Sequence, residues 1–395
     1  MFRSCPVCGC RDGEVLTRVE LTPVEAERLP SAFDVCLCTE CLFCFDDLNV
    51  TQTDFDAYYA SSGKYAQSNT GGSGGSANVD LKRWANVLYA LGPWISQTSR
   101  IVDVGCGKGG LLAALRAQGF HHVAGIEPSD GCREHLATQG FTAYRSVSEC
   151  LRDEQPFDCV VCSQVLEHVF ALDAFLADLG RLLAPDGVLY IEVPDAAGYA
   201  GLFHAPFYYF DREHINHFTR ISLSNLVASK LAALPVFCEA HSAFAVEGFE
   251  TPNVFSVFRR GAEHAKVMPD DEGASKIKLY VRKSQNEDRY PQLQPSINAS
   301  QSHAVPVLLW GYGAHLRRLL QKGVFQGLNV QGVIDRNKGG KGDRVMGVPI
   351  LSPDAIANPA FQDATVVITT VLYAGQIEHA LRSRSFEGRI VRLSD

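Results

Sequence analysis

The segment FDREHINHFTR, residues 210–220, gathers ionisable side chains between aromatic residues. Asp211, Glu213, His214 and His217 all fall within it. An imidazole changes protonation near neutral pH, so it can accept a proton from a substrate when a neighbouring group orients it. The alternative is a solvated turn whose histidines do no chemistry. The choice depends on what the rest of the chain builds around this segment.

Cysteines near the amino terminus form a second chemical pattern. Cys5 and Cys8 make one C-x2-C pair, and Cys38 and Cys41 make another. Two such pairs can deliver four thiolates tetrahedrally to one Zn²⁺, which leaves no open position and predicts a structural site. The remaining cysteines of this stretch are Cys10, Cys36 and Cys44. Cys36 or Cys44 can replace a ligand in this set, and the alternative to a metal site is a group of unrelated free thiols.

A glycine-rich turn is the third pattern. VDVGCGKGGLLAAL has the form of a strand, a turn and a helix, and Gly105, Gly107 and Gly110 satisfy the G-x-G-x-x-G dinucleotide fingerprint. The stretch AGIEPS ends a second strand on Glu127, 20 residues after Gly107, where a carboxylate can accept both ribose hydroxyls. A dinucleotide site and a turn that only packs a helix on a sheet are both compatible with these residues alone.

Strands and helices that alternate along the chain must position these groups. RIVDVGCG, HVAGIEP, FDCVVCSQ and GVLYIEVP read as strands between helical patterns, which predicts an α/β fold with a doubly wound, mostly parallel sheet. The predicted domains are a four-cysteine segment at 1–50, a Tyr/Gly/Ser-rich lid or linker at 51–80, the main α/β domain at 81–260, a linker with a helix at 261–300, and a smaller α/β domain at 301–395.

Bulk properties exclude some classes. The 395 residues include 46% hydrophobic and 20% charged residues, which is an ordinary globular composition. The net charge of −8 and the lack of a basic run argue against a nucleic-acid partner. We expect no signal peptide and no membrane span, because no apolar run is long enough. Thirteen cysteines without a secretion signal indicate reduced thiols and a cytoplasmic protein.

Asp103, two residues before Gly105, completes D-x-G-x-G-x-G, which resembles motif I of class I S-adenosylmethionine (SAM) methyltransferases. FDCVVCSQVLEHV resembles the fourth strand and following turn of that family, and LGRLLAPDGVLYIEVPD resembles its next helix, turn and strand. A dehydrogenase has no need of these two stretches. The resemblance implies a SAM site at Asp103, Gly105, Cys106, Gly107, Glu127, Pro128, Ser163, Gln164 and His168.

The order of the segments resembles a narrower family. A four-cysteine zinc segment, a SAM domain, an E-H-x-x-aromatic-type segment and a carboxyl-terminal α/β domain occur in zinc-containing C-methyltransferases of nucleotide-linked keto-deoxysugars. The resemblance implies that His214 is the catalytic base and that Glu213 orients it or contacts the substrate. It also implies an active-site tyrosine from DAYYASSGKYAQS, where Tyr58, Tyr59 and Tyr65 are the candidates.

This chain departs from that pattern at two positions. Members often have tyrosines where Asp211 and His217 stand here. Glu167 and His168 lie where many class I members line the site. The alternatives for this pair are a helix-start carboxylate and a packed imidazole.

The carboxyl-terminal stretch begins LLWGYGAHLRRLL, a strand, a G-x-G turn and a helix, and VIDRN ends a second strand on Asp335. The third fingerprint glycine is absent because Leu316 stands at that place. The resemblance implies a Rossmann-like domain that helps to hold the nucleotide-sugar, and the alternative is a structural domain without a ligand. The basic residues of KGGKGDR, which are Lys338, Lys341 and Arg344, can meet a pyrophosphate or form a solvated loop.

Taken together, the sequence predicts a SAM-dependent methyltransferase of a small molecule, with structural zinc. The sharper hypothesis is C-methylation of a nucleotide-linked keto-sugar through an enolate. O- or N-methylation of another natural product, methylation of rRNA, and a non-catalytic binding protein that keeps the fold remain as alternatives. The oligomeric state does not follow from the sequence.

Overall fold

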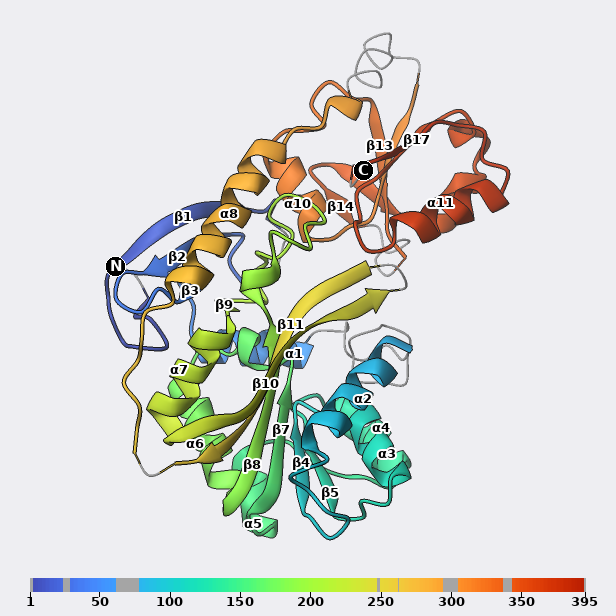
Figure 1. The fold of residues 1–395 in the computed structure, drawn as a ribbon. Helices are drawn as coiled ribbons and strands as arrows, with labels where there is room; N and C mark the ends of the chain where they lie inside the picture. Colours follow the sequence, from blue (N-terminus) through green and yellow to red (C-terminus); the bar gives the residue numbers. More distant parts are fainter. Residues whose placement is uncertain are drawn as a thin grey trace.

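The computed structural model describes residues 3–23, 29–61, 78–246, 249–261, 263–293, 305–336 and 343–393. Three sheets organise these residues (Figure 1), and they follow one another along the chain except for one strand of the first sheet, at residues 216–217. The predicted α/β fold is confirmed. Tyr65, Lys338, Lys341 and most of the expected lid lie outside the described residues.

The amino-terminal sheet is antiparallel and has the order β1-β2-β3-β9. Its strands are β1 (Gly13–Glu20), β2 (Ala32–Cys38), β3 (Cys44–Asp47) and β9 (Asn216–His217). The segment around His214 therefore supplies an edge strand to the cysteine-bearing sheet, with Cys44 paired to His217. His217 Nε2 lies 3.1 Å from Asp46 Oδ1, and both side chains are fully buried. His217 thus joins the two parts of the chain and is not exposed to a substrate pocket.

The central sheet has the order β10-β11-β8-β7-β4-β5-β6. Its strands are β4 (Ile101–Val104), β5 (Val123–Ile126), β6 (Thr142–Tyr144), β7 (Phe157–Ser163), β8 (Leu183–Pro194), β10 (Ala233–Val246) and β11 (Phe249–Arg260). Strands β4 to β8 are parallel, whereas β11 runs antiparallel to β8 and β10. The chain winds outward from β4 through β5 and β6, and then returns to β7 on the other side. Ligands of such sheets bind at this reversal, outside the carboxyl ends of β4 and β7.

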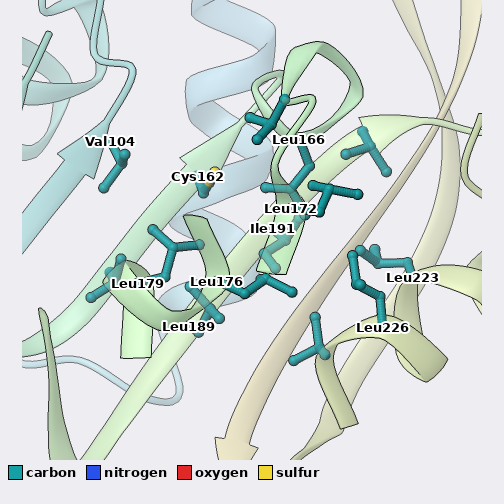
Figure 2. Packing of buried hydrophobic residues seen from close by; sticks show 14 of the residues in the cluster. Val104, Cys162, Leu166, Leu172, Leu176, Leu179, Leu189, Ile191, Leu223 and Leu226 are labelled. Carbon is teal, nitrogen blue, oxygen red and sulfur yellow. The ribbon is translucent and has the colours of Figure 1, made fainter. Parts of the chain in front are cut away.

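Helices cover both faces of this sheet. They are α2 (Asn78–Leu91), α3 (Gly110–Ala117), α4 (Asp130–Thr138), α5 (Val147–Asp153), α6 (Leu172–Leu182) and α7 (Arg220–Leu231), with the short η1 (Leu166–His168) and η2 (Ala196–Gly198) in the connections. Cys159 and Val161 of β7 pack beneath α2 and α3. Val160 and Cys162 pack in the cluster with α6 and α7 on the opposite face, part of which Figure 2 shows. Because alternate residues of a strand point to opposite faces, this two-sided burial accounts for the continuous apolar runs in the sequence.

A second doubly wound sheet follows, with the order β14-β15-β13-β12-β16-β17. Its elements are β12 (Val307–Trp310), α10 (Ala314–Gln321), β13 (Val330–Ile334), β14 (Arg344–Val345), β15 (Val348–Leu351), η4 (Pro353–Ala357), η5 (Pro359–Phe361), β16 (Thr365–Ile368), α11 (Ala374–Ser383) and β17 (Ile390–Arg392). Leu316, which replaces the third fingerprint glycine, is fully buried in α10. Its side chain fills the space between helix and sheet.

Helix α8 (Asp271–Glu287) and residues of α10 connect this sheet to the rest of the chain. Helix α8, followed by η3 (Pro291–Leu293), runs beside the amino-terminal sheet (Figure 1) and buries Ile277 and Tyr280 in the cluster that contains Phe33. Arg317 of α10 donates from Nε and Nη2 to the Thr22 carbonyl at 2.9 and 2.7 Å. The stretch expected as a linker is therefore in part a packed helix. Among the described residues, no helix is both long and apolar enough to cross a membrane.

His315 of α10 predicts a pH dependence for the carboxyl-terminal domain. Burial lowers the pKa of His315 to about 3 from an ordinary 6.5. Its Nε2 atom has no hydrogen-bond partner among the described residues. In the unfolded chain the imidazole gains a proton below pH 6.5, whereas in the folded domain it stays neutral down to about pH 3. Stability should therefore fall as the pH drops through this window.

We expect His315→Phe to reduce the loss of stability between pH 8 and pH 5 by about 1 kcal/mol, a value lowered because the ring is partly exposed. Hydrogen exchange of the α10 and β12 amides at both pH values measures this difference. The exposed His379 of α11 provides the control, since His379→Phe should leave the pH dependence as it is in the parent chain. An unchanged pH dependence in His315→Phe would contradict the assignment.

Candidate active site

The four predicted zinc-ligand cysteines come together. One sulfur from each of Cys5, Cys8, Cys38 and Cys41 lies within 4.8 Å of the other three. The Cys5–Cys41 and Cys8–Cys38 sulfur distances are both 3.5 Å. A tetrahedral ZnS4 site with Zn–S bonds of about 2.3 Å needs sulfurs about 3.8 Å apart, so small shifts would accommodate the ion.

The glycine turn joins β4 to α3 at the carboxyl edge of the sheet. Gly105 and Gly107 have φ of +77° and +52°, the left-handed region that favours glycine. The side chain of Asp103 is buried below this turn, and burial raises its pKa to about 7. The Cys106 side chain points into the cluster of Leu112 and other apolar residues, so only its backbone can line a ligand.

Glu127, at the end of β5, is held against the glycine turn. Its Oε2 accepts from the Gly107 N–H at 3.0 Å, and its Oε1 accepts from the Ser129 N–H at 2.8 Å. The side chain remains partly exposed next to Pro128, which is exposed. A carboxylate fixed in this way can still accept hydroxyl groups on its open side, as the ribose of a nucleoside cofactor requires.

Gly105 gives a direct test of this site. A Cβ added there would lie 2.5 Å from Val165 Cγ2, and an L-residue at this φ costs about 1–2 kcal/mol. We expect Gly105→Ala to weaken SAM binding at least about tenfold, because relief of the clash moves the turn after β7. Calorimetric titration with SAM measures the loss.

The matched control is Gly131→Ala in α4, where nothing lies within 4 Å of the added Cβ. Alanine is favoured over glycine inside a helix by roughly 0.5–1 kcal/mol, so this variant should bind SAM normally and melt no lower than the parent chain. Equal SAM affinity in Gly105→Ala and the parent chain would exclude the glycine turn as the cofactor site.

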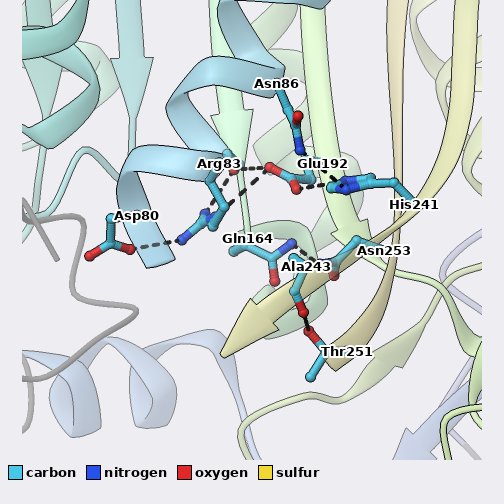
Figure 3. Close-up of polar contacts among 10 residues, drawn as sticks. Asp80, Arg83, Asn86, Gln164, Glu192, His241, Ala243, Thr251 and Asn253 are labelled. Atoms are coloured by element: carbon cyan, nitrogen blue, oxygen red, sulfur yellow. Dashed lines mark hydrogen bonds and ion pairs between the residues drawn. The ribbon is translucent and has the colours of Figure 1, made fainter. Parts of the chain in front are cut away.

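A buried polar network lies under the carboxyl edge (Figure 3). Ser163 Oγ accepts from Arg83 Nη2 at 2.9 Å and donates to Glu192 Oε2 at 2.7 Å. His241 Nε2 lies 3.2 Å from Glu192 Oε1, and Asn86 contacts the other ring nitrogen of His241. Burial alone would raise the pKa of Glu192, but the hydrogen bonds and the Arg83 charge outweigh it and hold that pKa below its usual range. The cofactor role expected for Ser163 stays a prediction, and its hydroxyl is committed to this network.

The turn after β7 carries the next group of predicted residues. Gln164 adopts a left-handed φ of +58° and contacts Asn253 through its amide. His168 Nδ1 lies 2.8 Å from the Tyr59 hydroxyl and 3.0 Å from the Glu213 carbonyl oxygen. Because a carbonyl only accepts, Nδ1 carries the proton, and Nε2 of His168 faces Glu167 at 3.8 Å.

The segment that contains His214 reaches the same place from the far end of the chain. Asp211 Oδ1 accepts from the backbone N–H groups of Glu213 and His214 at 2.7 and 2.9 Å, which closes the turn. The His214 ring stands edge-on to His168 with centroids 4.6 Å apart. The Glu213 carboxylate instead accepts from the Tyr58 hydroxyl at 2.8 Å. Tyr58 and Tyr59 come from α1 (Gln52–Ser61).

Folding thus brings His214, His168, Glu167 and Tyr59 to one place, next to the turn that contacts Gly105. The sequence suggested Glu213 as the carboxylate beside His214. In the structure Glu167 also lies close to His214. Sequence reasoning did not single out Arg83. The sequence shows Arg83 only as the single arginine of the amphipathic helix α2, which does not indicate a buried network. The two pairs of cysteines were found because the spacing of metal knuckles is local.

Comparison with known proteins agrees with this geometry. Residues 78–229 match the family model described as "Methyltransferase domain". They include the glycine turn, Glu127, the turn after β7 and His214. Residues 78–229 are therefore a methyltransferase domain. This domain contains the doubly wound, mostly parallel sheet that the sequence predicted.

Curated relatives match over part of this domain. A ubiquinone biosynthesis O-methyltransferase of Methylococcus capsulatus is 39% identical over 101 residues, 24% of this chain and 42% of that protein. The same-named protein of Maricaulis maris is 39% identical over 98 residues, 23% of this chain and 38% of that protein. The chain thus spans about two fifths of the length of these relatives. The crystal structure of a Burkholderia thailandensis 1,6-didemethyltoxoflavin-N1-methyltransferase is 18% identical, with 61% of this chain and 100% of that chain covered and a TM-score of 0.41.

Proposed function

We propose that this chain is a SAM-dependent methyltransferase whose acceptor is a small molecule. The observation that carries the proposal is the convergence of a proton acceptor, His214, on a methyltransferase domain with an intact glycine turn and ribose-type carboxylate. SAM supplies a methyl group on a positively charged sulfur, which is already an electrophile. The protein therefore has to align the acceptor and remove a proton from it.

The residues of the site suit a cofactor of this type. The left-handed glycines expose backbone at the turn, and Glu127 offers a carboxylate that is fixed by two N–H groups. Backbone of Cys106 and Gly107, together with Asp103 and the turn at Gln164 and His168, would complete the contacts.

The acceptor that we favour is a carbon acid, the carbon next to a ketone of a nucleotide-linked keto-sugar. His214 takes the proton of the C–H bond, and the electron pair of that bond moves onto the ketone oxygen as an enolate. The enolate carbon then forms a bond to the methyl carbon as the methyl–sulfur bond breaks. Tyr59, whose hydroxyl is anchored beside His168, is placed to donate to the developing oxyanion.

The sugar part of the proposal is supported by the arrangement of the segments. The carboxyl-terminal sheet is doubly wound about β12, and its G-x-G turn is tied to the next strand because the Tyr312 N–H donates to Asp335 Oδ2 at 3.1 Å. Sheets of this kind receive nucleotides where the strand order reverses, which here is at the carboxyl ends of β12 and β16. The cysteine cluster, which we propose to hold structural Zn²⁺, fixes the sheet from which β3 pairs with β9 beside His214.

O-methylation is the second candidate, because the curated relatives are named as O-methyltransferases. A hydroxyl acceptor also gives up a proton to a base, so the site geometry serves both reactions. The difference is that only a carbon acid takes up deuterium that stays bound to carbon, because the deuterium of a hydroxyl group exchanges back in ordinary water.

The deciding experiment is a mass-resolved assay in deuterated water with SAM and two panels of acceptors. One panel holds nucleotide-linked 4-keto-deoxysugars and the other holds phenols and catechols. Methylation of a keto-sugar, with deuterium uptake beside the ketone before transfer, is the expected result. Methylation confined to the phenolic panel would replace the carbon acid with a hydroxyl acceptor. Failure to bind SAM at all would refute the enzyme itself.

A further inference from the structure

Two buried glutamates of the methyltransferase domain, Glu192 and Glu167, differ in their hydrogen-bond partners. Glu192 is fully buried, but Ser163, His241 and Arg83 all contact its carboxylate. Glu167 is 1% exposed, and neither of its carboxylate oxygens has a hydrogen-bond partner among the described residues. An ionised carboxylate in that position is costly unless a positive charge forms next to it.

The groups that face Glu167 can supply that charge. One Glu167 oxygen, one ring nitrogen of His168 and one of His214 all lie within 4.8 Å of one another. His168 is restrained, since its Nδ1 is bonded to the Glu213 carbonyl oxygen and to Tyr59. His214 has no such bond from a ring nitrogen to another element among the contacts of the described residues. Nε2 of His168 can also gain a proton, and it faces Glu167 at 3.8 Å, but His214 is the imidazole that we propose to take the acceptor proton.

Other charges near Glu167 do not replace this partner. Arg83 lowers the pKa of Glu167 and Glu192 raises it, but both contribute less than burial and His214 do. Arg83 is also committed to Ser163 and Asp80. The net result is that burial raises the pKa of Glu167 to about 7.

We propose that Glu167, rather than the neighbouring Glu213, is the carboxylate that stabilises protonated His214, and that it is therefore a positioning residue for the catalytic base. The inference rests on the proposed function of His214. When His214 takes the acceptor proton it becomes an imidazolium, and the Glu167 carboxylate, already desolvated, gains its counter-charge at that moment. The electron pair of the broken C–H or O–H bond stays with the acceptor and attacks the methyl carbon, so the proton and the charge both balance. Glu213 acts on the other side, where its carboxylate holds Tyr58 and its carbonyl holds His168.

Nitrogen-15 NMR of the histidine rings in the full chain tests this without any acceptor. His214 is assigned by the loss of its signals in His214→Gln. In Glu167→Gln the nitrogen-15 shifts of the His214 ring at about pH 6.5 should move toward those of a neutral imidazole, because an opposite charge within about 4–6 Å is removed. Glu213→Gln is the matched control one residue away from His214, and it should move these shifts by less. Glu167→Met, which leaves no buried polar atom without a partner, serves as a second neutral variant if the glutamine variant does not fold.

Kinetics give the second readout once an acceptor is known. Glu167→Gln should lower kcat about 10²- to 10⁴-fold, shift the acidic limb of the kcat/KM profile, and leave SAM affinity unchanged. Glu167→Asp, which keeps the charge, should recover part of the rate.

Three results would overturn the assignment. The first is an unshifted His214 in Glu167→Gln, and the second is an equal shift in Glu213→Gln. The third is a tightly bound divalent cation beyond the one assigned to the cysteines, found by elemental analysis and lost in Glu167→Gln, since the carboxylate would then serve the cation. A failed acceptor screen with the expected His214 shift would count against the proposed substrate and leave the Glu167 assignment supported.

Discussion

Replacing Cys38 with serine should remove zinc from the chain and unfold the amino-terminal sheet. Cys38 is fully buried at the end of β2 and its sulfur lies 3.5 Å from that of Cys8. Structural zinc sites release about 10–16 kcal/mol on metal binding in small domains, so loss of one of four thiolates should cost several kcal/mol. The measurement is elemental analysis of the purified chain, together with its melting curve before and after treatment with a chelator.

The control is Cys36→Ser, two residues earlier on the same strand. Cys36 is also fully buried, but its sulfur is not part of the four-sulfur group. This variant should keep its zinc, and chelation should still destabilise it. If both serine variants retain zinc equally, the ligand set has been assigned wrongly. If the parent chain carries no metal, the four cysteines are a group of reduced thiols. Because β3 pairs with β9 next to the segment that we propose to be catalytic, we also expect Cys38→Ser to lose methyl transfer.

The central strands of the main sheet could be predicted because they are buried on two faces, whereas the long hairpin of β10 and β11 was not foreseen. FDCVVCSQ and GVLYIEVP are mostly apolar runs of the kind that a covered parallel sheet explains. The glycine turn could also be predicted, because the left-handed φ at Gly105 favours glycine and the sequence has glycine there. The amino-terminal sheet was not foreseen, because its fourth strand, β9, comes from residues about 170 positions away from β3.

Side-chain direction is what the sequence does not encode locally. Glu213 and His214 are neighbours along the chain, yet the Glu213 carboxylate contacts Tyr58 whereas Glu167, from another element, approaches His214. His217 looked like a change to the pocket, but it lies in an edge strand and binds Asp46. A turn that Asp211 closes sends successive side chains to different neighbours, and only the tertiary packing decides which ones.

The second large effect is expected at His214. Removal of a general base costs about 10²- to 10⁴-fold in rate, so His214→Ala should lose that factor in kcat with the acceptor that the screen identifies. SAM affinity and melting temperature should stay close to those of the parent chain, because the ring is only half-buried and the turn is closed by the backbone N–H of residue 214. Added imidazole should restore part of the rate, since the alanine variant leaves room for a free base.

His217→Ala, three residues further on, separates catalysis from folding. Its ring is buried against Asp46, and a buried polar group that loses its hydrogen-bond partner typically costs about 1–3 kcal/mol. This variant should melt at a lower temperature while its folded fraction keeps a normal kcat, which is the reverse of the His214→Ala pattern. Two results would mean that another group accepts the acceptor proton. One is a His214→Ala variant that retains its rate, and the other is a variant that imidazole does not rescue although deuterium exchange continues. His168 would then be the one to replace next, because its Nε2 faces the same carboxylate.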